Sequence, residues 1–326
     1  MKVLLIRVSS LGDVLHNMPI VADILSQFPH AQIDWVVEEA FVDLIKLNPN
    51  VHNIIPFALR RWRKNLFSAT VRAEMSAFKR RLQLETYDVI LDTQGLLKTG
   101  VIMGLANGGV KVGLANGTEG SGYEALSRIF HTLSVPVDSH THAVLRGRLV
   151  AARAFNYTEH IEQTTPNFGL IAPPLDTPDW LPLNAYAVFF HGTAGDDKKW
   201  AAYDWIALGK HLQQRDMPVL LPWGNNIEHI DAQQLASHLP NAVVLPKLSM
   251  LEAITLAQRA SLVVGVDTGL THIAAAYHRP TIEIYCASPR WKTEGNWSDQ
   301  VINLGDKGSP PSVGEVIEAA NRLLAR

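Results

Sequence analysis

The segment MKVLLIRVSSLGD at residues 1–13 decides the fold class, because a strand-forming run passes directly into the start of a helix. Its apolar run is shorter than the roughly 7 to 15 residues of a signal-peptide core, and Arg7 interrupts it. We therefore predict a buried first strand at Val3–Val8. A helical pattern follows at Val14–Gln27, so the polar turn SSLGD lies at the carboxyl end of the strand.

Short β-rich runs alternate with longer helical patterns along the whole chain, which is typical of parallel sheets covered by crossover helices. The first half contains further predicted strands at Ile33–Val37, Asn53–Pro56, Val89–Asp92 and Val110–Gly113 and a helix at Ala69–Leu84. The second half contains predicted strands at Tyr186–Phe190, Pro218–Pro222, Ala242–Leu245, Leu262–Asp267 and Thr281–Tyr285 and a last helix at Val313–Ala325. This pattern predicts an α/β protein with two Rossmann-like, doubly wound parallel sheets.

Two domains are expected, since 326 residues are about twice the length of a typical domain. The alternation stops at 158–184, where five prolines occur. We predict an N-terminal domain at 1–165, a linker at 166–184 and a C-terminal domain at 185–326. The pattern leaves open whether the last helix, 313–325, packs back on the N-terminal domain. Because ligands bind at the carboxyl ends of the strands in such folds, we expect the two sheets to face a central cleft.

The composition excludes several classes of protein. A formal net charge of −2 provides no basic field for nucleic acid. No apolar stretch approaches the ~20 residues that cross a bilayer, so we expect a cytoplasmic protein that can still rest on a membrane surface. The single cysteine, Cys286, excludes an internal disulfide and is interpreted as a small apolar residue that ends a strand. No DxD-like motif is placed to hold a pyrophosphate-bound cation, so we predict neither a metal nor a cofactor.

Asp13 is the first candidate catalytic residue. It falls in the opening turn of the helix after the first strand, at the carboxyl edge of the sheet, where a carboxylate can accept the proton of an attacking hydroxyl. Taken alone, an aspartate at this position is more typical of a helix cap. The same turn lacks the GxGxxG pattern, which argues against a nicotinamide or flavin enzyme.

Cations gather in the first half of the chain. RRWRK at residues 60–64 is followed by Arg72 and by KRR at 79–81. Such runs are commonly solvated, yet Trp62, Leu66 and Phe67 interleave apolar side chains, and this combination suits an amphiphile that carries phosphates or carboxylates. Lys98 follows the strand Val89–Asp92 and is therefore expected at the same sheet edge as Asp13, where it could bind an acidic acceptor.

Two loops of the second half are suited to phosphate. The loop HGTAGDDKKW, which follows the strand Tyr186–Phe190, contains two glycines, Thr193 and the cations Lys198 and Lys199. A solvated turn with surface lysines is the alternative. The motif VDTGLTH begins a helix near Asp267, and the free amide groups of that first turn form a natural pyrophosphate site.

Other interpretations of these residues stay open at this stage. Asp267 is also suited to a helix cap, and His272 to a packed position in the helix. Glu228, which follows LPWG at residues 221–224, can accept hydrogen bonds from ribose hydroxyls or simply lie at the surface.

Eight motifs, in this order and at compatible spacing, resemble those of the ADP-heptose:lipopolysaccharide heptosyltransferase family. They are SSLGD, WVVEE, RRWRK, DTQGLLK, DDKKW, LPWG, LPKLS and VDTGLTH, and they span nearly the whole chain. RRWRK and DTQGLLK are more similar to heptosyltransferases of type I than to those that add a second heptose. The resemblance implies a GT-B fold, with the acceptor bound by the N-terminal domain and the nucleotide sugar by the C-terminal domain.

The resemblance also implies an inverting transfer of L-glycero-D-manno-heptose from ADP-L-glycero-β-D-manno-heptose to the Kdo of Kdo-lipid A, with peripheral contact at the cytoplasmic face of the inner membrane. Asp13 would be the base, and Lys198 would offset charge on the departing ADP. The implied donor-binding residues are Thr193, Ala194, Lys198, Glu228, Leu248, Asp267, Thr268, Gly269, Leu270 and His272. The implied acceptor-binding residues are Ser10, Gly12, Arg60, Arg61, Arg63, Lys64 and Lys98. The family often has a threonine where this chain has Ala194, so one hydroxyl hydrogen bond to phosphate is missing.

Three alternatives remain: a heptosyltransferase for another core acceptor, a GT-B-like sugar-nucleotide epimerase, and a noncatalytic sugar-nucleotide-binding protein in which Asp13 is structural. The basic segment favours a transferase, because an epimerase needs no acceptor site. Since water would waste an activated sugar, we also expect the domains to close over both substrates before transfer.

Overall fold

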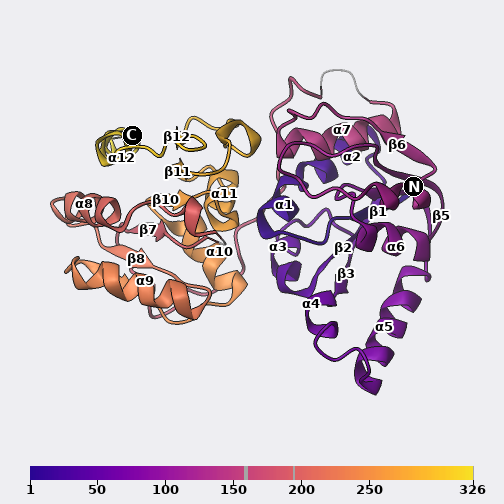
Figure 1. The fold of residues 1–326 in the computed structure, drawn as a ribbon, viewed down its shortest axis with the longest axis horizontal. Coiled ribbons are helices and arrows are strands. Elements are labelled where there is room, and N and C mark those ends of the chain that lie inside the picture. The colour runs from indigo at the N-terminus through magenta and orange to yellow at the C-terminus, as the bar shows by residue number, and fades with distance from the viewer. Residues whose placement is uncertain (158–160, 194, 326) are drawn as a thin grey trace. The chain divides into compact units, whose positions relative to one another are not determined.

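The computed structural model describes residues 1–157, 161–193 and 195–325. The chain divides into two compact units, Met1–Ile171 and Ala172–Arg326, which are called the first and the second unit below (Figure 1). Each unit contains a six-stranded sheet whose paired strands all run parallel, with helices against both faces. The predicted α/β class with two doubly wound sheets is confirmed.

The sheet of the first unit has the strand order β3-β2-β1-β4-β5-β6. Its strands are β1 (Lys2–Ile6), β2 (Gln32–Glu38), β3 (Asn53–Phe57), β4 (Thr86–Asp92), β5 (Asn107–Leu114) and β6 (Leu133–Val135). Its helices are α1 (Leu11–His16), α2 (Pro19–Gln27), α3 (Val42–Ile45), α4 (Leu59–Trp62), α5 (Ala69–Leu82), α6 (Leu97–Leu105) and α7 (Ala143–Phe155), with short 3-10 turns at Glu39–Phe41 and Ala125–Phe130. α2 and α7 pack together over one face of the sheet, while α5 and α6 cover the other.

The sheet of the second unit has the strand order β12-β11-β10-β7-β8-β9. Its strands are β7 (Ala187–Phe190), β8 (Val219–Leu221), β9 (Ala242–Val244), β10 (Leu262–Val266), β11 (Thr281–Tyr285) and β12 (Val301–Gly305). Its helices are α8 (Ala202–Gln213), α9 (Asn226–Ser237), α10 (Met250–Arg259), α11 (Gly269–Ala276) and α12 (Val313–Leu324), with 3-10 turns at Asp196–Lys198 and Arg290–Lys292.

Both sheets have the same topology. Read from β9 to β12, the second sheet contains the third, second, first, fourth, fifth and sixth strands of its unit, which is the order that the first sheet has from β3 to β6. The strand order reverses between β1 and β4 in the first unit and between β7 and β10 in the second. At such a switch point the loops after the two central strands diverge and leave a crevice in which ligands bind. In each unit, therefore, the loops after these two strands are where a site is expected.

The predicted strands occur close to their predicted positions, but the sequence pattern missed β6 and β12, each of which lies at one edge of its sheet. The predicted single helix Val14–Gln27 is wrong, since the structure divides it into α1 and α2. Pro19 is the first residue of α2. Because proline has no N–H to donate to the preceding turn, it begins a new helix rather than continuing α1.

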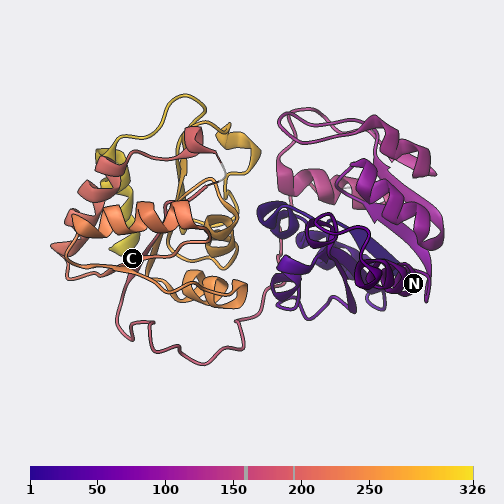
Figure 2. The same ribbon diagram turned by 60° about the horizontal axis from the view of Figure 1, so that its bottom comes forward.

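Residues 166–184 contain no helix or strand, and Figure 2 shows the later part of this segment as a long irregular loop. The boundary between the units nevertheless lies inside the predicted linker. Asn48 Nδ2 donates to the Phe168 carbonyl at 3.2 Å, which ties the start of the segment to the first unit. Arg259 donates to the Leu175 carbonyl at 2.8 Å, which ties the following residues to the second.

The last helix, α12, belongs to the second unit. It packs against α8 and against β10, β11 and β12. Val316, Ala320 and Leu323 of α12 are buried in the same core as Trp205. The apolar face of α12 thus packs within the core of the second unit.

Candidate active site

Asp13 lies in the first turn of α1, just after the carboxyl end of β1. Its Oδ1 is 2.6 Å from Nη2 of Arg7 and 3.7 Å from Nη2 of Arg146. Its Oδ2 accepts hydrogen bonds from the backbone N–H and the hydroxyl of Ser10, at 3.1 and 2.9 Å. The Asp13 side chain is 35% exposed, whereas each arginine side chain is only 4% exposed. The carboxylate is therefore held from inside the fold and still reachable from solvent.

The electrostatic surroundings keep Asp13 ionised. Burial by itself would raise the pKa of the Asp13 carboxyl, but the charges of Arg7 and Arg146 and the Ser10 N–H outweigh burial and hold this pKa well below its usual range. A general base must be unprotonated at the working pH, and Asp13 meets this requirement. The same arginines make the Asp13 carboxylate a weak base.

The loop after β4 brings Lys98 to the Asp13 loop. Asp92, fully buried, accepts hydrogen bonds from the backbone N–H groups of Gln94 and Gly95 at 2.9 and 3.1 Å, which shapes this loop. Gly95 has φ +71, a left-handed conformation that favours glycine. From the first turn of α6, Lys98 Nζ donates to Ser9 Oγ at 3.2 Å. The predicted location of Lys98 beside the Asp13 turn is confirmed.

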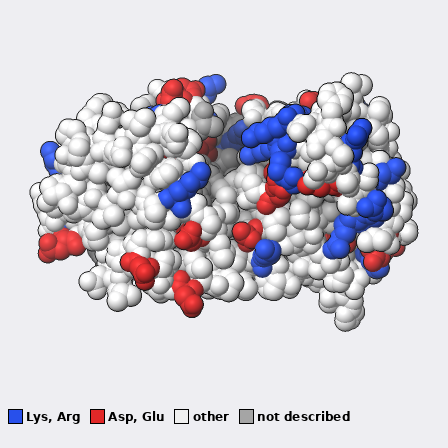
Figure 3. Space-filling view, turned by 90° about the horizontal axis from the view of Figure 1, so that it is seen from below, with Lys and Arg blue, Asp and Glu red and all other residues white. Residues whose placement is uncertain are grey.

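The cations of RRWRK differ in how far they are neutralised. Arg61 is held between Glu39 at 3.0 Å and Glu74 at 2.8 Å, so its charge is already balanced. Arg60 lies over the ring of Phe41, with 5.5 Å between the guanidinium carbon and the ring centroid. Figure 3 shows Lys and Arg side chains gathered on one face of the first unit, with acidic side chains beside them.

The remaining residues predicted to bind the acceptor lie in the same region of the first unit. Arg63 and Lys98 line one cavity, which is described below. Ser10 is the N-cap of α1 and Gly12 lies in its first turn, so both flank Asp13. Lys64 is exposed, directly after α4. Their contacts with an acceptor stay predictions.

In the second unit, the loops after β7 and β10 meet at Asp267. Its Oδ2 is 3.0 Å from Nζ of Lys198, and its Oδ1 is 3.1 Å from Nε2 of His272. The Nδ1 of His272 is in turn 2.8 Å from Oε1 of Glu283, which is fully buried in the middle of β11. Lys198, Asp267, His272 and Glu283 thus form a row of alternating charge, and Lys198, 38% exposed, is its accessible end.

These contacts set the protonation states along the row. Burial by itself would lower the pKa of His272, but the charge of Glu283 and hydrogen bonds to Asp267 and Glu283 raise it to about 10. Burial would raise the pKa of Asp267, but the hydrogen bond and charge of His272 and the charge of Lys198 keep it far below its usual range. His272 is therefore a buried imidazolium at neutral pH, held between two carboxylates.

The start of α11 lies beside this row. Thr268 is the N-cap of α11, and Gly269 and Leu270 are its first two residues. The first N–H groups of a helix have no partner within the helix, so they can donate to an anion. Thr193 is half-buried in the loop after β7. Ala194, the position at which the family often has a second threonine, lies outside the described residues.

Glu228 and Leu248 follow the next two strands of the sheet. Glu228 Oε2 accepts the N–H of Gly224 at 2.7 Å, and its Oε1 accepts from Asn225 at 2.8 Å. A Cβ at Gly192 would lie 2.6 Å from the Glu228 carboxyl carbon, so only glycine allows the β7 loop to approach this closely. Leu248 is half-buried in the loop between β9 and α10. The structure thus places Glu228 against the loop that precedes Lys198.

Three residues of these sites were not identified from the sequence: Arg7, Arg146 and Glu283. Arg7 and Glu283 each interrupt an apolar strand, and a charged side chain at a buried strand position requires a partner of opposite charge. That signal was present in LLIRV and TIEIY. Arg146 gives no such signal, because it reaches Asp13 from α7, far along the chain. Among the residues that the structure describes, no group of His, Cys, Asp and Glu could hold a metal ion.

Comparison with known proteins shows which family this chain resembles. The model of glycosyltransferase family 9 (heptosyltransferase) matches residues 75–318. Lipopolysaccharide heptosyltransferase 1 of Pseudomonas aeruginosa is 38% identical over 285 residues, which cover 87% of this chain and 78% of the relative. Lipopolysaccharide heptosyltransferase 1 of Escherichia coli K12 is 38% identical over 287 residues, which cover 87% of this chain and 88% of the relative.

Solved structures show the same relationship. E. coli heptosyltransferase WaaC with ADP superposes with a TM-score of 0.86 at 33% identity, covering 99% of this chain and 100% of that chain. E. coli heptosyltransferase II, at 20% identity and a TM-score of 0.77, shares the fold and covers 100% of this chain and 99% of that chain. The predicted resemblance is confirmed: this chain is a GT-B glycosyltransferase that belongs to glycosyltransferase family 9, the heptosyltransferases.

Proposed function

We propose that this heptosyltransferase transfers L-glycero-D-manno-heptose from ADP-L-glycero-β-D-manno-heptose to the Kdo of Kdo-lipid A, with inversion at the anomeric carbon and with Asp13 as general base. The observation that carries the proposal is the relationship to proteins named lipopolysaccharide heptosyltransferase 1, at 35–38% identity over 87% of the chain. A solved relative carries ADP-2-deoxy-2-fluoro heptose, which supports an ADP-heptose donor.

In the proposed reaction, the Kdo hydroxyl gives its proton to Asp13 while its oxygen bonds to the anomeric carbon. The bond between that carbon and the phosphate oxygen breaks, and ADP leaves with the electron pair. Arg7 and Arg146 orient Asp13 and keep it ionised until then. Lys198 and the amide groups at the start of α11 stabilise the charge that develops on ADP. The proposal requires no metal and no cofactor.

The second unit offers suitable groups for each part of the donor. Asp267 holds Lys198 in place, and the first N–H groups of α11 suit the diphosphate. We assign Thr193 to the same region, Glu228 to the ribose and the Leu248 backbone to adenine, whereas His272, predicted as a donor ligand, is buried with both ring nitrogens engaged and is assigned the positioning of Asp267. These assignments follow the family's motifs, and the contacts of Lys198 and His272 with Asp267 support them.

We assign the anionic groups of the acceptor to Arg60, Arg63, Lys64 and Lys98. Arg61 is better suited to fixing the segment, because Glu39 and Glu74 already balance its charge. A lipid acceptor also implies peripheral contact with the cytoplasmic face of the inner membrane. In the described part of the chain, no helix has both the length and the apolar character needed to span a bilayer.

The epimerase alternative is supported only by a shared fold. A putative UDP-N-acetylglucosamine 2-epimerase from Listeria monocytogenes has a TM-score of 0.54 at 11% identity. The family match, by contrast, covers residues 75–318 and names a transferase. A heptosyltransferase that uses another core acceptor is the remaining alternative.

The direct test is to incubate the purified protein with ADP-heptose and Kdo-lipid A and to follow the acceptor by mass spectrometry. We expect a mass gain of one heptose. Asp13→Asn keeps an oxygen that can accept the Ser10 N–H but removes the base, so the rate should fall by roughly 100- to 10,000-fold. Binding of ADP-heptose to this variant, measured by calorimetry, should match the wild type.

Asp13→Ala is the matched comparison, because it also removes the helix-capping hydrogen bond. It should be less stable than Asp13→Asn by roughly 1 kcal/mol and equally inactive. Absence of the mass gain with the wild type would refute the acceptor assignment. An Asp13→Asn variant with more than about a tenth of the wild-type rate would refute the role of the base.

A further inference from the structure

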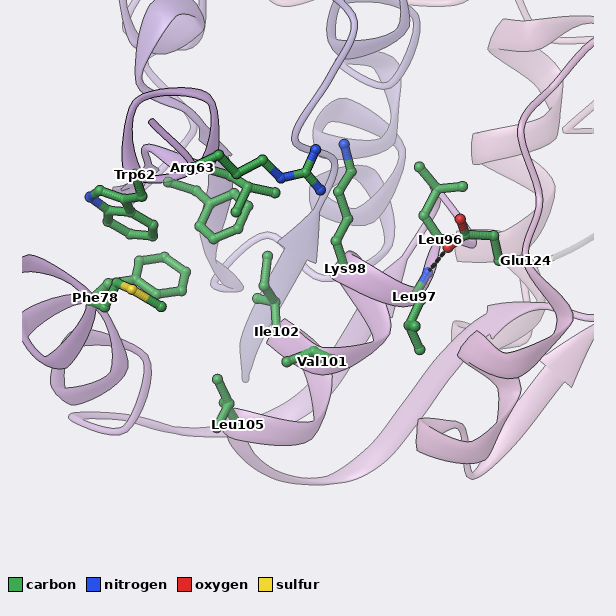
Figure 4. A pocket seen from close by; sticks show the side chains of 13 residues that line it. Trp62, Arg63, Phe78, Leu96, Leu97, Lys98, Val101, Ile102, Leu105 and Glu124 are labelled. Carbon is green, nitrogen blue, oxygen red and sulfur yellow. Dashed lines mark hydrogen bonds between the residues drawn. The ribbon is translucent and has the colours of Figure 1, made fainter. Parts of the chain in front are cut away.

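The first unit contains a cavity of about 610 Å³ whose apolar walls have no role in the transfer as proposed so far. Its walls are the aromatic side chains of Phe57, Trp62 and Phe78 and the α6 side chains of Val101, Ile102 and Leu105. The size falls within the range of roughly 300 to 1,000 Å³ that is usual for small-molecule sites. Figure 4 shows Trp62 of α4, Phe78 of α5 and the three α6 side chains around the cavity.

The α6 wall is an unpaired apolar face of a helix. Leu97, Val101 and Leu105 are four residues apart and therefore lie in one row along α6. Leu97 and Val101 are 40% and 42% exposed, and Met75 on the opposite α5 wall is 41% exposed. Apolar side chains of this size remain open to water here, although the same cavity is lined by the buried aromatic side chains of Phe57, Trp62 and Phe78.

Cations occupy one end of this apolar cavity. Arg63 and Lys98 both line it, and Figure 4 shows their charged ends directed to the same side, away from Leu105. Burial lowers the pKa of Lys98, and the nearby charges of Arg60 and Arg63 lower it further, against the opposing charge of Glu38. The one acidic lining residue, Glu124, is engaged at the N-terminus of α6, where its Oε2 accepts the Leu97 N–H at 2.5 Å.

The charged end of the cavity is continuous with the catalytic turn. Lys98 lines the cavity and also donates to Ser9 Oγ at 3.2 Å, and Ser9 precedes the Ser10 that bonds Asp13. A ligand whose anionic group meets Lys98 can therefore extend its hydroxyl-bearing part towards Asp13 and its hydrocarbon part into the cavity. An apolar cavity with cations at its mouth matches an anionic amphiphile, and a purely polar sugar would leave the apolar walls unfilled.

We propose that this cavity binds an acyl chain of the acceptor, so that the protein recognises hydrocarbon as well as anionic sugar. The proposal rests on the proposed function for its choice of a lipid acceptor. The chain would lie between α5 and α6, with its anionic headgroup at Arg63 and Lys98. Each methylene that leaves water on binding strengthens binding on the order of fourfold, so even a partly inserted chain has a measurable effect.

The test compares two acceptors with the same Kdo-containing headgroup, one acylated and one deacylated, at concentrations at which the acylated form is monomeric. We expect the wild-type KM to be at least roughly tenfold lower for the acylated acceptor. Val101→Trp fills part of the cavity from an exposed helix position and should bring the ratio of the two KM values close to one. Val110→Trp is the matched control, because Val110 is 43% exposed on β5 and does not line the cavity, and it should keep the wild-type ratio.

A binding measurement with dodecyl phosphate and butyl phosphate makes the test independent of catalysis. Wild type and Val110→Trp should bind the longer chain at least roughly tenfold more tightly, and Val101→Trp should lose that preference. Equal KM values for the two acceptors in the wild type would overturn the proposal. A preference that survives in Val101→Trp would also overturn it, since the chain would then bind elsewhere, such as in a bilayer.

The two proposals fail in different ways. If neither acceptor gains a heptose, the proposed function fails, while the alkyl phosphate measurement still decides whether the cavity binds hydrocarbon. If both acceptors are used with one KM, the proposed function stands and the acyl-chain site fails.

Discussion

Asp13 combines the contacts of a helix cap with the surroundings expected of the proposed general base. Its Oδ2 accepts the Ser10 N–H, as a cap would, while its Oδ1 faces Arg7 and Arg146. A carboxylate that only caps a helix does not require two buried guanidinium groups beside it. These groups hold the carboxylate in its ionised form and in one orientation, and both are conditions for accepting a proton at a fixed point.

The adjacent lysines at 198 and 199 have separate partners, although the sequence presents them as a pair. Lys198 lies 3.0 Å from Asp267, beside the start of α11. Lys199 lies 3.0 Å from both Asp196 and Asp231. Only Lys198 is therefore placed beside the amide groups that suit a diphosphate.

We expect Lys198→Met to lower kcat for heptose transfer by roughly 100- to 1,000-fold, because a fixed cation no longer stabilises the departing ADP. Lys199→Met is the matched control and should stay within about threefold of the wild type, since it removes only partly exposed ion pairs. Steady-state kinetics with both variants measures the difference. Equal losses in the two variants would contradict the distinct role of Lys198.

At the scale of elements, α11 and β11 are joined through one buried ion pair. His272 of α11 lies between Asp267 and Glu283, and Glu283 also accepts from the Tyr285 hydroxyl at 2.8 Å and from the Gly295 N–H at 2.9 Å. A buried imidazolium is tolerated only because carboxylates flank it. This pair fixes where α11 begins relative to the sheet, and hence where its amide groups lie.

The His272 pair makes the stability of the second unit depend on pH. The pKa of His272 is raised from about 6.5 to about 10, so the stabilisation is fully present below pH ~6.5 and is lost as the pH rises towards ~10. Glu283→Gln should weaken the pH dependence of the free energy of unfolding between pH ~6.5 and ~10. It should also lower the free energy of unfolding at neutral pH by roughly 3 to 5 kcal/mol. Denaturant unfolding between pH 6 and pH 10 measures both effects.

Tyr285→Phe is the control for that experiment. It removes a hydrogen bond to the Glu283 carboxylate but leaves the charge in place. The free energy of unfolding should therefore fall by about 1.5 to 3 kcal/mol, while its dependence on pH stays that of the wild type. If Glu283→Gln kept the wild-type slope, the His272–Glu283 pair would not be its source.

Patterns within single elements were sufficient for ten of the twelve strands in the described part of the chain and misleading for one helix. The run TIEIY at Thr281–Tyr285 has the bounds predicted for it, because all five of its residues are buried and Pro280 directly precedes them. At Val14–Gln27 the apolar periodicity continues across Pro19, and the backbone chemistry of proline decided the outcome instead. β6 has only three residues, and four of the five residues of β12 are only half-buried, so neither strand shows a clear apolar run.

At the scale of the whole molecule, each unit has its own core and its own switch point. Trp205 and Val316 belong to the core of the second unit, and Leu4 and Trp62 to that of the first. The prolines of 166–184 end the regular structure, but residues on both sides of the boundary are anchored to their own unit. The irregular segment is therefore tied to each unit by hydrogen bonds on its own side of the boundary.

ADP should protect one unit from hydrogen exchange more than the other. We expect slower exchange on adding ADP at residues 191–193, 195–199, 224–228 and 267–272, because these loops follow the central strands of the second sheet. Mass spectrometry of peptic fragments measures this, with inorganic phosphate as the control ligand. Protection at residues 9–13 without protection at these loops would contradict the assignment of the donor to the second unit.

The sequence alone determined the α/β class, the two halves, the family and the loops that carry the candidate residues. These properties are local, because alternating patterns and motif order are written in consecutive residues. The pairing of Asp13 with Arg146, the different partners of Lys198 and Lys199, and the cavity between α5 and α6 were decided only by the tertiary structure. Each depends on residues that are distant in the chain, and their charges and apolar surfaces acquire a function only when folding brings them within a few ångströms.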